Sequence, residues 1–173
     1  EGVPAQKVDL VREGRFVGYL TSRETAPLLG LASNGTMRAE SWAHIPLIRM
    51  TNINLEPGPW TLEALIADTD DGLLMSTNRS WSIDDKRYHF QFSTEIGWEI
   101  QGGKKGRMLK NPSYSGITTE FWNSCDAICD KNHWTLWGTP NCGKGQPSQT
   151  MGTGHGAAPS RFRNVTVGIA YAG

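Results

Sequence analysis

The sequence has no excess charge of either sign and no long apolar run. Seventeen Lys and Arg residues balance seventeen Asp and Glu residues among 173. The chain therefore lacks the long-range attraction that draws strongly basic proteins to nucleic acids and anionic bilayers. No apolar stretch approaches the roughly 18 residues that span a bilayer. We therefore expect no nucleic acid and no membrane among its partners.

Cysteine is also scarce, and the start of the chain lacks the features of a leader. Three cysteines are an odd and sparse set, which argues against a disulfide framework and favours a reducing compartment. Residues 1–4 carry no initiator Met, no basic region and no apolar region of a signal peptide. We therefore expect this sequence to be a part cut from a longer chain.

The residues that are present favour β-structure in one domain. A length of 173 residues is typical of a single domain, which would cover residues 1–173. Residues 7–12 and 15–20 alternate around Glu13-Gly14, which predicts a β-hairpin. Further β-prone runs predict strands at 48–55, 73–77, 87–93, 96–101, 107–110, 134–137 and 161–170. Turn residues separate the four runs between 73 and 110, as in an antiparallel meander.

Helices are predicted to be few and short. Residues 23–29 favour a short helical turn that Gly30 ends. Thr61 can cap the next helix, whose apolar residues recur at helical spacing until Gly72 ends it. These two segments are too small to make an all-helical protein.

The remaining segments complete the fold prediction. Residues 31–46 show no clear period and predict a loop, residues 138–159 are a glycine-rich stretch, and the run 117–130 is compatible with helix or strand. No regular alternation of strands and helices supports a parallel sheet. The sequence therefore predicts a mainly β fold, α+β at most, with an antiparallel sheet that is barrel- or sandwich-like and a few short helices.

One glycine-rich stretch resembles a phosphate-binding loop. Gly138-Thr139-Pro140-Asn141-Cys142-Gly143-Lys144 satisfies the first seven positions of a P-loop. The eighth residue is Gly145, which lacks the hydroxyl that should reach Mg²⁺, and the glycines and proline after it cannot start the required helix. We therefore do not predict nucleotide binding.

Four soft ligands follow one another in the last third of the chain. Cys125, Cys129, His133 and Cys142 could be ligands of a structural zinc. On one helix face the first three would spread over about 12 Å, farther than a tetrahedral ion with bonds of about 2.3 Å can gather. The favoured interpretation is that Cys125 and Cys129 are small, buried apolar side chains.

The histidines and tryptophans have structural and functional interpretations. His44, His89 and His133 are expected to be hydrogen-bonded structural residues. His155 differs because the glycines on either side would let a ligand approach closely. A platform of tryptophans could bind carbohydrate, but core packing is the favoured role. The tryptophans concerned are Trp81, Trp98, Trp122, Trp134 and Trp137.

The most conspicuous candidate for chemistry is Cys142. It lies beside a glycine and two residues before Lys144, in the predicted loop 141–156. Loops of this length are uncommon unless they are functional. A nearby cation favours the thiolate form that nucleophilic attack or metal binding requires.

Several motifs, taken together, resemble a known family. They are Glu1-Gly2-Val3-Pro4-Ala5-Gln6, Gly18-Tyr19-Leu20, His44-Ile45-Pro46, Arg49-Met50-Thr51-Asn52, Leu55-Glu56-Pro57-Gly58, Cys142-Gly143-Lys144 and Asn164-Val165-Thr166-Val167-Gly168. In this order they resemble the C-terminal half of the TldD/PmbA family, and the segment with Cys142 resembles the TldD branch.

The resemblance implies a zinc metallopeptidase that processes or degrades unfolded peptides in the cytoplasm. It implies a related TldD/PmbA-type subunit as partner, in a homo- or hetero-oligomer, and the family is also known as a modulator of DNA gyrase. Two zinc ligands and the general base of the family come from a His-Glu-x-x-x-His helix. The position that matches the third ligand, a cysteine, is Cys142.

The sequence departs from this pattern in one respect. None of the four histidines is followed by Glu, so the chain contains no His-Glu-x-x-x-His motif. We therefore expect a catalytically incomplete segment that contributes one zinc ligand of the intact enzyme and does not retain zinc alone. Whether Arg49, Asn52, Glu120 or His155 face the active site is left open.

Two other functions are compatible with the same residues. A non-catalytic β domain could bind an extended peptide by strand addition or provide a surface for a partner subunit. A β domain that binds carbohydrate through its tryptophans is supported by composition alone.

Overall fold

The computed structural model describes residues 1–170, which form two compact units. The first unit contains residues 1–56 and 135–157. The second contains residues 57–134 and the C-terminal residues from Ala158. The prediction of one domain over residues 1–173 stays a prediction, because two compact units can belong to one domain or to two.

The first unit begins with the predicted hairpin. Strands β1 (Val11–Arg12) and β2 (Arg15–Phe16) pair antiparallel, with Val11 opposite Phe16. Both turn residues, Glu13 and Gly14, have positive φ angles, as a type I′ turn requires. The ladder is shorter than predicted because the amides of residues 17 and 18 both donate to the carbonyl of residue 10.

The predicted turn before Gly30 is a 3₁₀ helix, η1 (Ala26–Leu29). Pro27 has no N–H to donate, so a longer helix is disfavoured here. Gly30 ends the element in the left-handed region at φ 66°, as predicted. The side chains of Ser22 and Thr25 each accept the other's amide hydrogen at 3.0 Å, which stabilises the preceding turn.

Two further strands lie where the sequence predicts a loop and a longer strand. Strand β3 (Met37–Arg38) lies within the predicted loop 31–46 and pairs with β4 (Leu47–Ile48). The predicted strand 48–55 therefore pairs only at its start and at one bridge, where Asn52 lies opposite Gly154. Side-chain bonds, together with one main-chain bond from the Leu55 amide to the Gly156 carbonyl at 2.8 Å, replace the missing ladder in this segment.

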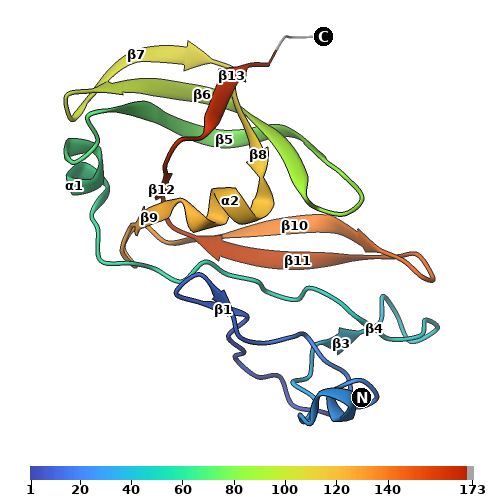
Figure 1. Cartoon of the computed structure of the whole chain (residues 1–173). Coiled ribbons are helices and arrows are strands. Elements are labelled where there is room, and N and C mark those ends of the chain that lie inside the picture. Colours follow the sequence, from blue (N-terminus) through green and yellow to red (C-terminus); the bar gives the residue numbers. More distant parts are fainter. Residues whose placement is uncertain (171–173) are drawn as a thin grey trace. The chain divides into compact units, whose positions relative to one another are not determined.

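The predicted loop 141–156 is wrong. Strands β10 (Thr135–Lys144) and β11 (Gln149–Ala157) form a long antiparallel hairpin across it (Figure 1). Gln149, Met151 and Thr153 are buried while the residues between them are exposed, which is a strand alternation. Gly152, Gly154 and Gly156 disguise that period in the sequence.

The second unit contains a five-stranded antiparallel sheet (Figure 1). Its strands are β5 (Asp71–Ile83), β6 (His89–Gln101), β7 (Lys104–Lys110), β8 (Pro112–Ile117) and β13 (Thr166–Ile169). The order is β13-β8-β6-β5, with β7 paired to the second half of β6. The predicted meander is therefore confirmed, and the runs 87–93 and 96–101 join in β6. Gly97 permits this, because a Cβ there would lie 2.8 Å from the Pro112 ring.

Two short helices and a two-stranded sheet complete the second unit. Helix α1 (Leu62–Ala67) is confirmed, since Thr61 accepts the Ala64 amide hydrogen at 3.1 Å, but the helix ends before Gly72. The ambiguous run contains helix α2 (Thr118–Asn123) followed by strand β9 (Cys125–Ile128). Strand β9 pairs with β12 (Ser160–Phe162), so the predicted strand 161–170 is divided between β12 and β13.

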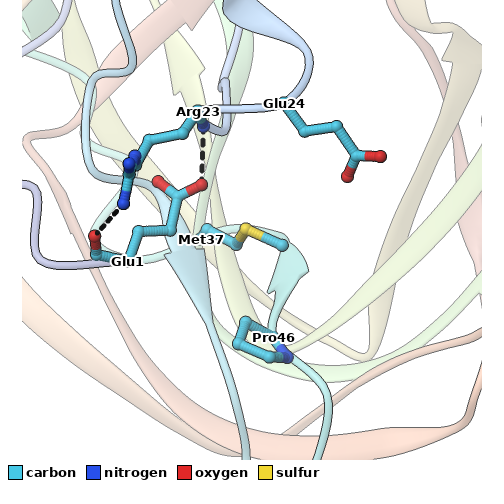
Figure 2. A pocket seen from close by; sticks show the side chains of 5 residues that line it. All are labelled: Glu1, Arg23, Glu24, Met37 and Pro46. Carbon is cyan, nitrogen blue, oxygen red and sulfur yellow. Dashed lines mark hydrogen bonds between the residues drawn. The ribbon is translucent and has the colours of Figure 1, made fainter.

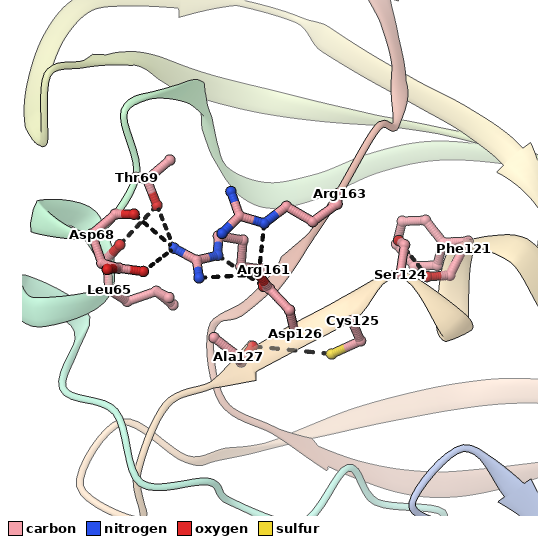
Figure 3. Close-up of polar contacts among 10 residues, drawn as sticks. All are labelled: Leu65, Asp68, Thr69, Phe121, Ser124, Cys125, Asp126, Ala127, Arg161 and Arg163. Atoms are coloured by element: carbon pink, nitrogen blue, oxygen red, sulfur yellow. Dashed lines mark hydrogen bonds and ion pairs between the residues drawn. The ribbon is translucent and has the colours of Figure 1, made fainter.

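An arginine connects three of these elements in the second unit (Figure 3). Arg161 on β12 donates to both carboxylate oxygens of Asp126 on β9, at 2.8 and 3.1 Å. It also donates to the carboxylate of Asp68 at 2.9 Å and to the Thr69 hydroxyl at 3.1 Å, just after α1. Arg163 adds a third bond to Asp126 at 2.6 Å. The network holds the end of α1 against the β9–β12 pair.

Two groups of side chains make the core of the second unit. The apolar core contains Leu65, Ala127, Cys129 and Ala158, with Trp60, Leu62, Ile128 and Trp134 packed against it. The aromatic cluster contains Phe90, Phe92, Tyr114, Phe121 and Phe162, and the exposed Trp122 packs against its outside. The predicted core role holds for Trp134. It is wrong for Trp81, Trp122 and Trp137, which are more than half exposed.

The structure confirms the mainly antiparallel β fold with a few short helices. The barrel alternative is wrong for residues 1–170, because the largest sheet is open, with β5 and β13 at its ends. In the same residues no helix combines the length and the hydropathy that crossing a bilayer demands.

Candidate functional site

Cys142 lies on strand β10 in the first unit and not in a flexible loop. Its partner across the hairpin is Met151, and its side chain is half-buried. Thr139 pairs with Thr153, so strand β10 contains one more residue than β11 between the two pairs. This is a β-bulge directly before Cys142, a feature that re-aims side chains at functional sites.

Arg49 binds the main chain at this point of the hairpin. Arg49 directly follows β4 in the sequence and is only 2% exposed. Nη2 donates to the carbonyl oxygen of Cys142 at 2.5 Å, and Nη1 donates more weakly to that of Gln149 at 3.5 Å. In return, Lys144 donates its ammonium hydrogen to the carbonyl oxygen of Ile48. The segment after β4 is therefore tied to both strands of the hairpin.

Gln149 makes a second set of contacts, from the other strand. It is 1% exposed, and its amide donates to the Ile45 carbonyl at 2.7 Å while accepting from the Glu40 amide at 2.9 Å. The Glu40 carboxylate accepts the Thr150 amide hydrogen at 2.8 Å. These bonds stabilise residues 40–45, which contain no regular element.

Asn52 and His155 lie farther along the same hairpin. Asn52 accepts the Gly154 amide hydrogen at 3.1 Å, so it supports β11. His155 donates from Nδ1 to the Ile53 carbonyl at 3.0 Å, which leaves Nε2 to accept from the Thr153 hydroxyl at 2.8 Å. Both ring nitrogens are engaged. Met151 is the residue opposite Cys142, and His155 lies four positions beyond it, about 13 Å along the strand. His155 therefore does not reach Cys142.

The other two cysteines belong to the second unit. Cys125 begins strand β9, and Cys129 follows it in the apolar core, so the helical spacing assumed for them is wrong. Burial raises the pKa of both thiols, which disfavours the thiolate that a metal needs. Cys129 is fully buried, as predicted, whereas Cys125 is half-buried.

The predicted structural histidines are confirmed as hydrogen-bonded. His44 bonds to Ser41 at 2.8 Å, and His133 bonds to Asp130 at 2.9 Å. His89 bonds to Asp84 at 3.0 Å. The pKa of Asp84 is lowered by the backbone amides of Tyr88 and His89 and by this side-chain bond. All three rings have a structural partner.

Two cavities were not foreseen from the sequence. In the first unit, Glu1, Arg23, Glu24, Met37 and Pro46 line a shallow cavity of about 420 Å³ (Figure 2). The Glu1 carboxylate there accepts the Arg23 amide hydrogen at 2.6 Å, which lowers its pKa. In the second unit, Glu120 lines a cavity of about 610 Å³ together with the Asp84–His89 pair. Glu120 therefore lies in a different unit from Cys142.

The donor set can be compared with what zinc requires. A catalytic zinc is held by three protein ligands. Residues 1–170 contain no group of three His, Cys, Asp or Glu side chains that could hold a metal. Cys142 offers a single half-buried thiol on a strand whose backbone is held in place. Cys142 could therefore provide one zinc ligand, but the described residues cannot form a complete zinc centre by themselves.

Comparison with known proteins assigns the chain to a family. A family model described as the PmbA/TldA metallopeptidase C-terminal domain matches residues 1–168. The chain belongs to this family. Its match to the PmbA/TldA domain covers both units, from the first residue to strand β13.

Curated members of the family have similar sequences. The Metalloprotease TldD homolog of Haemophilus influenzae is 32% identical over 168 residues, which are 97% of this chain and 34% of that protein. A metalloprotease of Methanothermobacter thermautotrophicus is 33% identical over 168 residues, 97% of this chain and 36% of that protein. The chain therefore spans about a third of the length of these relatives.

Solved structures show the same fold. TldE from Thermococcus kodakarensis superposes with a TM-score of 0.74 at 19% identity, covering 96% of this chain and 34% of that one. A Thermotoga maritima protein, whose structure is named for a modulator of a DNA gyrase, superposes with a TM-score of 0.71 at 15% identity. It covers 96% of this chain and 34% of that one. At such identities the likeness shows the fold alone.

Proposed function

We propose that this chain is the C-terminal part of a TldD-like zinc metallopeptidase that processes or degrades unfolded peptides. Cys142 provides the third zinc ligand, and a His-Glu-x-x-x-His helix elsewhere in a longer chain provides the other two and the general base. The observation that carries the proposal is the family match over residues 1–168. The relatives' name of metalloprotease and their threefold greater length also support it.

The residues around Cys142 have clear roles in this proposal. The Cys142 thiolate would bind the zinc ion. The bond from the Arg49 side chain to the Cys142 carbonyl holds the strand that carries this thiolate. A zinc ion bound by three protein ligands acidifies a water molecule into a nucleophile at neutral pH. Asn52 and His155 connect residues 52–53 to β11 through hydrogen bonds. The chain alone remains catalytically incomplete.

The proposal includes a compartment and a partner. The balanced charge supports a protein that acts on peptides and does not bind nucleic acid or a membrane surface. The three cysteines are free, which supports a cytoplasmic location. A related TldD/PmbA-type subunit is the proposed partner in a homo- or hetero-oligomer.

The test is to replace each cysteine in the longer chain that carries the helix motif. Cys142→Ala should lower both zinc occupancy and hydrolysis of an unstructured peptide by orders of magnitude, because it removes one of three ligands. Metal content by mass spectrometry and peptide turnover measure the two effects. Retention of zinc and turnover by this variant would refute the assignment of the ligand.

Cys125→Ala and Cys129→Ala are the matched controls. Each removes a small thiol in the second unit and should cost about 1 kcal/mol of stability without loss of zinc. If either control loses zinc as completely as Cys142→Ala, the metal site includes that residue and the proposed ligand set is wrong.

A non-catalytic, peptide-binding role is the second candidate, and one observation favours it. Strand β5 has thirteen residues, and among residues 1–170 it pairs only with β6. Its outer edge could therefore accept an extended peptide. In this case the Cys142→Ala variant would keep full affinity for an unstructured peptide, and the unmodified longer chain would not hydrolyse it.

A further inference from the structure

Arg49 is a buried cation without a carboxylate partner. Its side chain is 2% exposed, and no Asp or Glu lies within ion-pair distance of it among residues 1–170. The buried Nε has no hydrogen-bond partner at all. Burying a charge in this way is costly, and neutral carbonyls compensate it only in part. Stabilisation of the fold alone therefore does not explain why an arginine occupies this position.

The contacts of Arg49 converge on the backbone of Cys142. Its stronger hydrogen bond is the one to the Cys142 carbonyl, at 2.5 Å, and its weaker one reaches Gln149 on the facing strand. The β-bulge lies immediately before Cys142. A bulge interrupts the regular ladder, so the backbone there is free to shift unless another group holds it. The guanidinium is the group that holds it.

We propose that Arg49 is the positioning residue for Cys142. It fixes the carbonyl of the bulged strand and thereby the direction of the thiol. Outer groups that orient a metal ligand typically account for 10- to 100-fold in metal affinity. The part of this inference that concerns zinc rests on the proposed function, whereas the part that concerns the backbone does not.

Arg38 provides a matched control in the same unit. Its two terminal nitrogens donate to the carbonyl of Gly152, at 3.3 and 3.4 Å, on strand β11 of the same hairpin. It is half-buried and makes no bond to Cys142. Arg38→Met therefore removes an arginine-to-carbonyl contact from β11, opposite the bulge, and leaves the bond to the Cys142 carbonyl in place.

The first experiment uses this chain without any metal. Arg49→Met should raise the hydrogen-exchange rates of amides in residues 142–151 about tenfold or more, because bonds to charged donors are the stronger ones. Alkylation of the Cys142 thiol, read by mass spectrometry of its peptide, should also become faster. Arg49→Lys keeps the charge and should recover part of both effects, and Arg38→Met should change neither.

The second experiment uses the longer chain loaded with Co²⁺ or Zn²⁺. Arg49→Met should weaken zinc binding by about 10- to 100-fold. It should also alter the thiolate-to-cobalt charge-transfer absorption, a band that depends on the orientation of the sulfur. Arg49→Lys should restore the band in part, and Arg38→Met should leave both measurements unchanged.

The outcomes separate this inference from the proposed function. Exchange and alkylation rates equal to those of the unmodified chain in Arg49→Met would overturn it. An equal rise in exchange in the β1–β2 hairpin would indicate general unfolding, and Arg49→Lys without any rescue would then count against the inference. The backbone effect of Arg49→Met should persist in a Cys142→Ala background. If it persists while Cys142→Ala retains zinc, only the proposed ligand is wrong.

Discussion

The two units of the chain are stabilised in different ways. The buried side chains of the first unit are mostly polar, and among its described residues only Ala26 and Met151 are buried apolar ones. The buried polar residues of the first unit are Thr21, Ser22, Thr36, Arg49, Gln149 and Thr153. The second unit has a five-stranded sheet, an apolar core and the aromatic cluster.

This difference teaches which residues control each unit. In the first unit, side chains satisfy main-chain groups that are about a hundred residues away, as Arg49, Asn52 and Gln149 do. In the second unit, the strand ladders satisfy the main chain, so the side chains are free to pack. Replacing buried polar residues should therefore lower stability most in the first unit, and truncating aromatic residues should lower it most in the second.

Phe121→Ala should have the largest effect on stability. Its ring stacks on Phe162 at 3.9 Å and lies 5.0 Å from the Phe90 ring. Removing it should cost about 3 kcal/mol of unfolding free energy, as for other large core truncations. Urea denaturation gives the total loss, and native-state hydrogen exchange should place it in β6 and not in β11.

Trp42→Ala is the control for this truncation. Trp42 is 99% exposed in the first unit, so its loss should change the unfolding free energy by less than about 0.5 kcal/mol. Equal loss of protection in β11 and β6 after Phe121→Ala would show that the two units unfold together, which would break the comparison.

Gln149→Ala should have the next largest effect, and in the other unit. It leaves the Ile45 carbonyl and the Glu40 amide without their partner, at a cost of about 2 kcal/mol. Gln6→Ala is the matched control, because Gln6 makes a similar amide-to-carbonyl bond to Ser33 while exposed. Hydrogen exchange in β11 should increase for Gln149→Ala only, and a similar increase for Gln6→Ala would contradict the role of burial.

The smallest predicted effect is a pH dependence in the second unit. Hydrogen bonds from Arg161 and then from Arg163 lower the pKa of Asp126 from its ordinary value of 3.8. The unfolded chain therefore binds a proton more readily, so this contribution is present above about pH 4 and is lost as the pH falls through the lowered pKa. Because the carboxylate is partly exposed, we expect less than about 1 kcal/mol.

Asp126→Asn isolates this contribution from those of the other acidic residues. Between pH 7 and 5 the difference in stability between the two proteins should stay constant, and below pH 4 the unmodified chain should lose more stability than the variant. Urea midpoints across this range measure the difference. Parallel pH curves for the two proteins would show that the Asp126 pairs contribute nothing measurable.

The elements that the sequence predicted well depend on local signals. Glu13-Gly14 makes the first turn, Gly30 ends η1, and Thr61 caps α1. Each signal acts within a few residues of chain, because a positive φ angle or a cap bond needs only its immediate neighbours. The meander around β6 was predictable for the same reason, since its strands follow one another with short turns.

The candidate site was predictable only in part. The family resemblance and the glycine-rich composition around Cys142 predict it as the central residue, and this role stays a prediction. The strand that carries Cys142 was predicted as a loop, because glycine hides the alternation of buried residues in β11. Arg49 was noted without a role, since no local pattern indicates that it is buried.

The sequence by itself therefore determined the family, the mainly antiparallel β class and the local turns and caps. Only the tertiary structure decided that residues 135–157 form a hairpin and that Arg49 donates to the carbonyl of Cys142, 93 residues away. It also decided that His155 is bonded to Ile53 and does not reach the thiol. The physical reason is that these arrangements arise from hydrogen bonds between distant segments, which no window of neighbouring residues records.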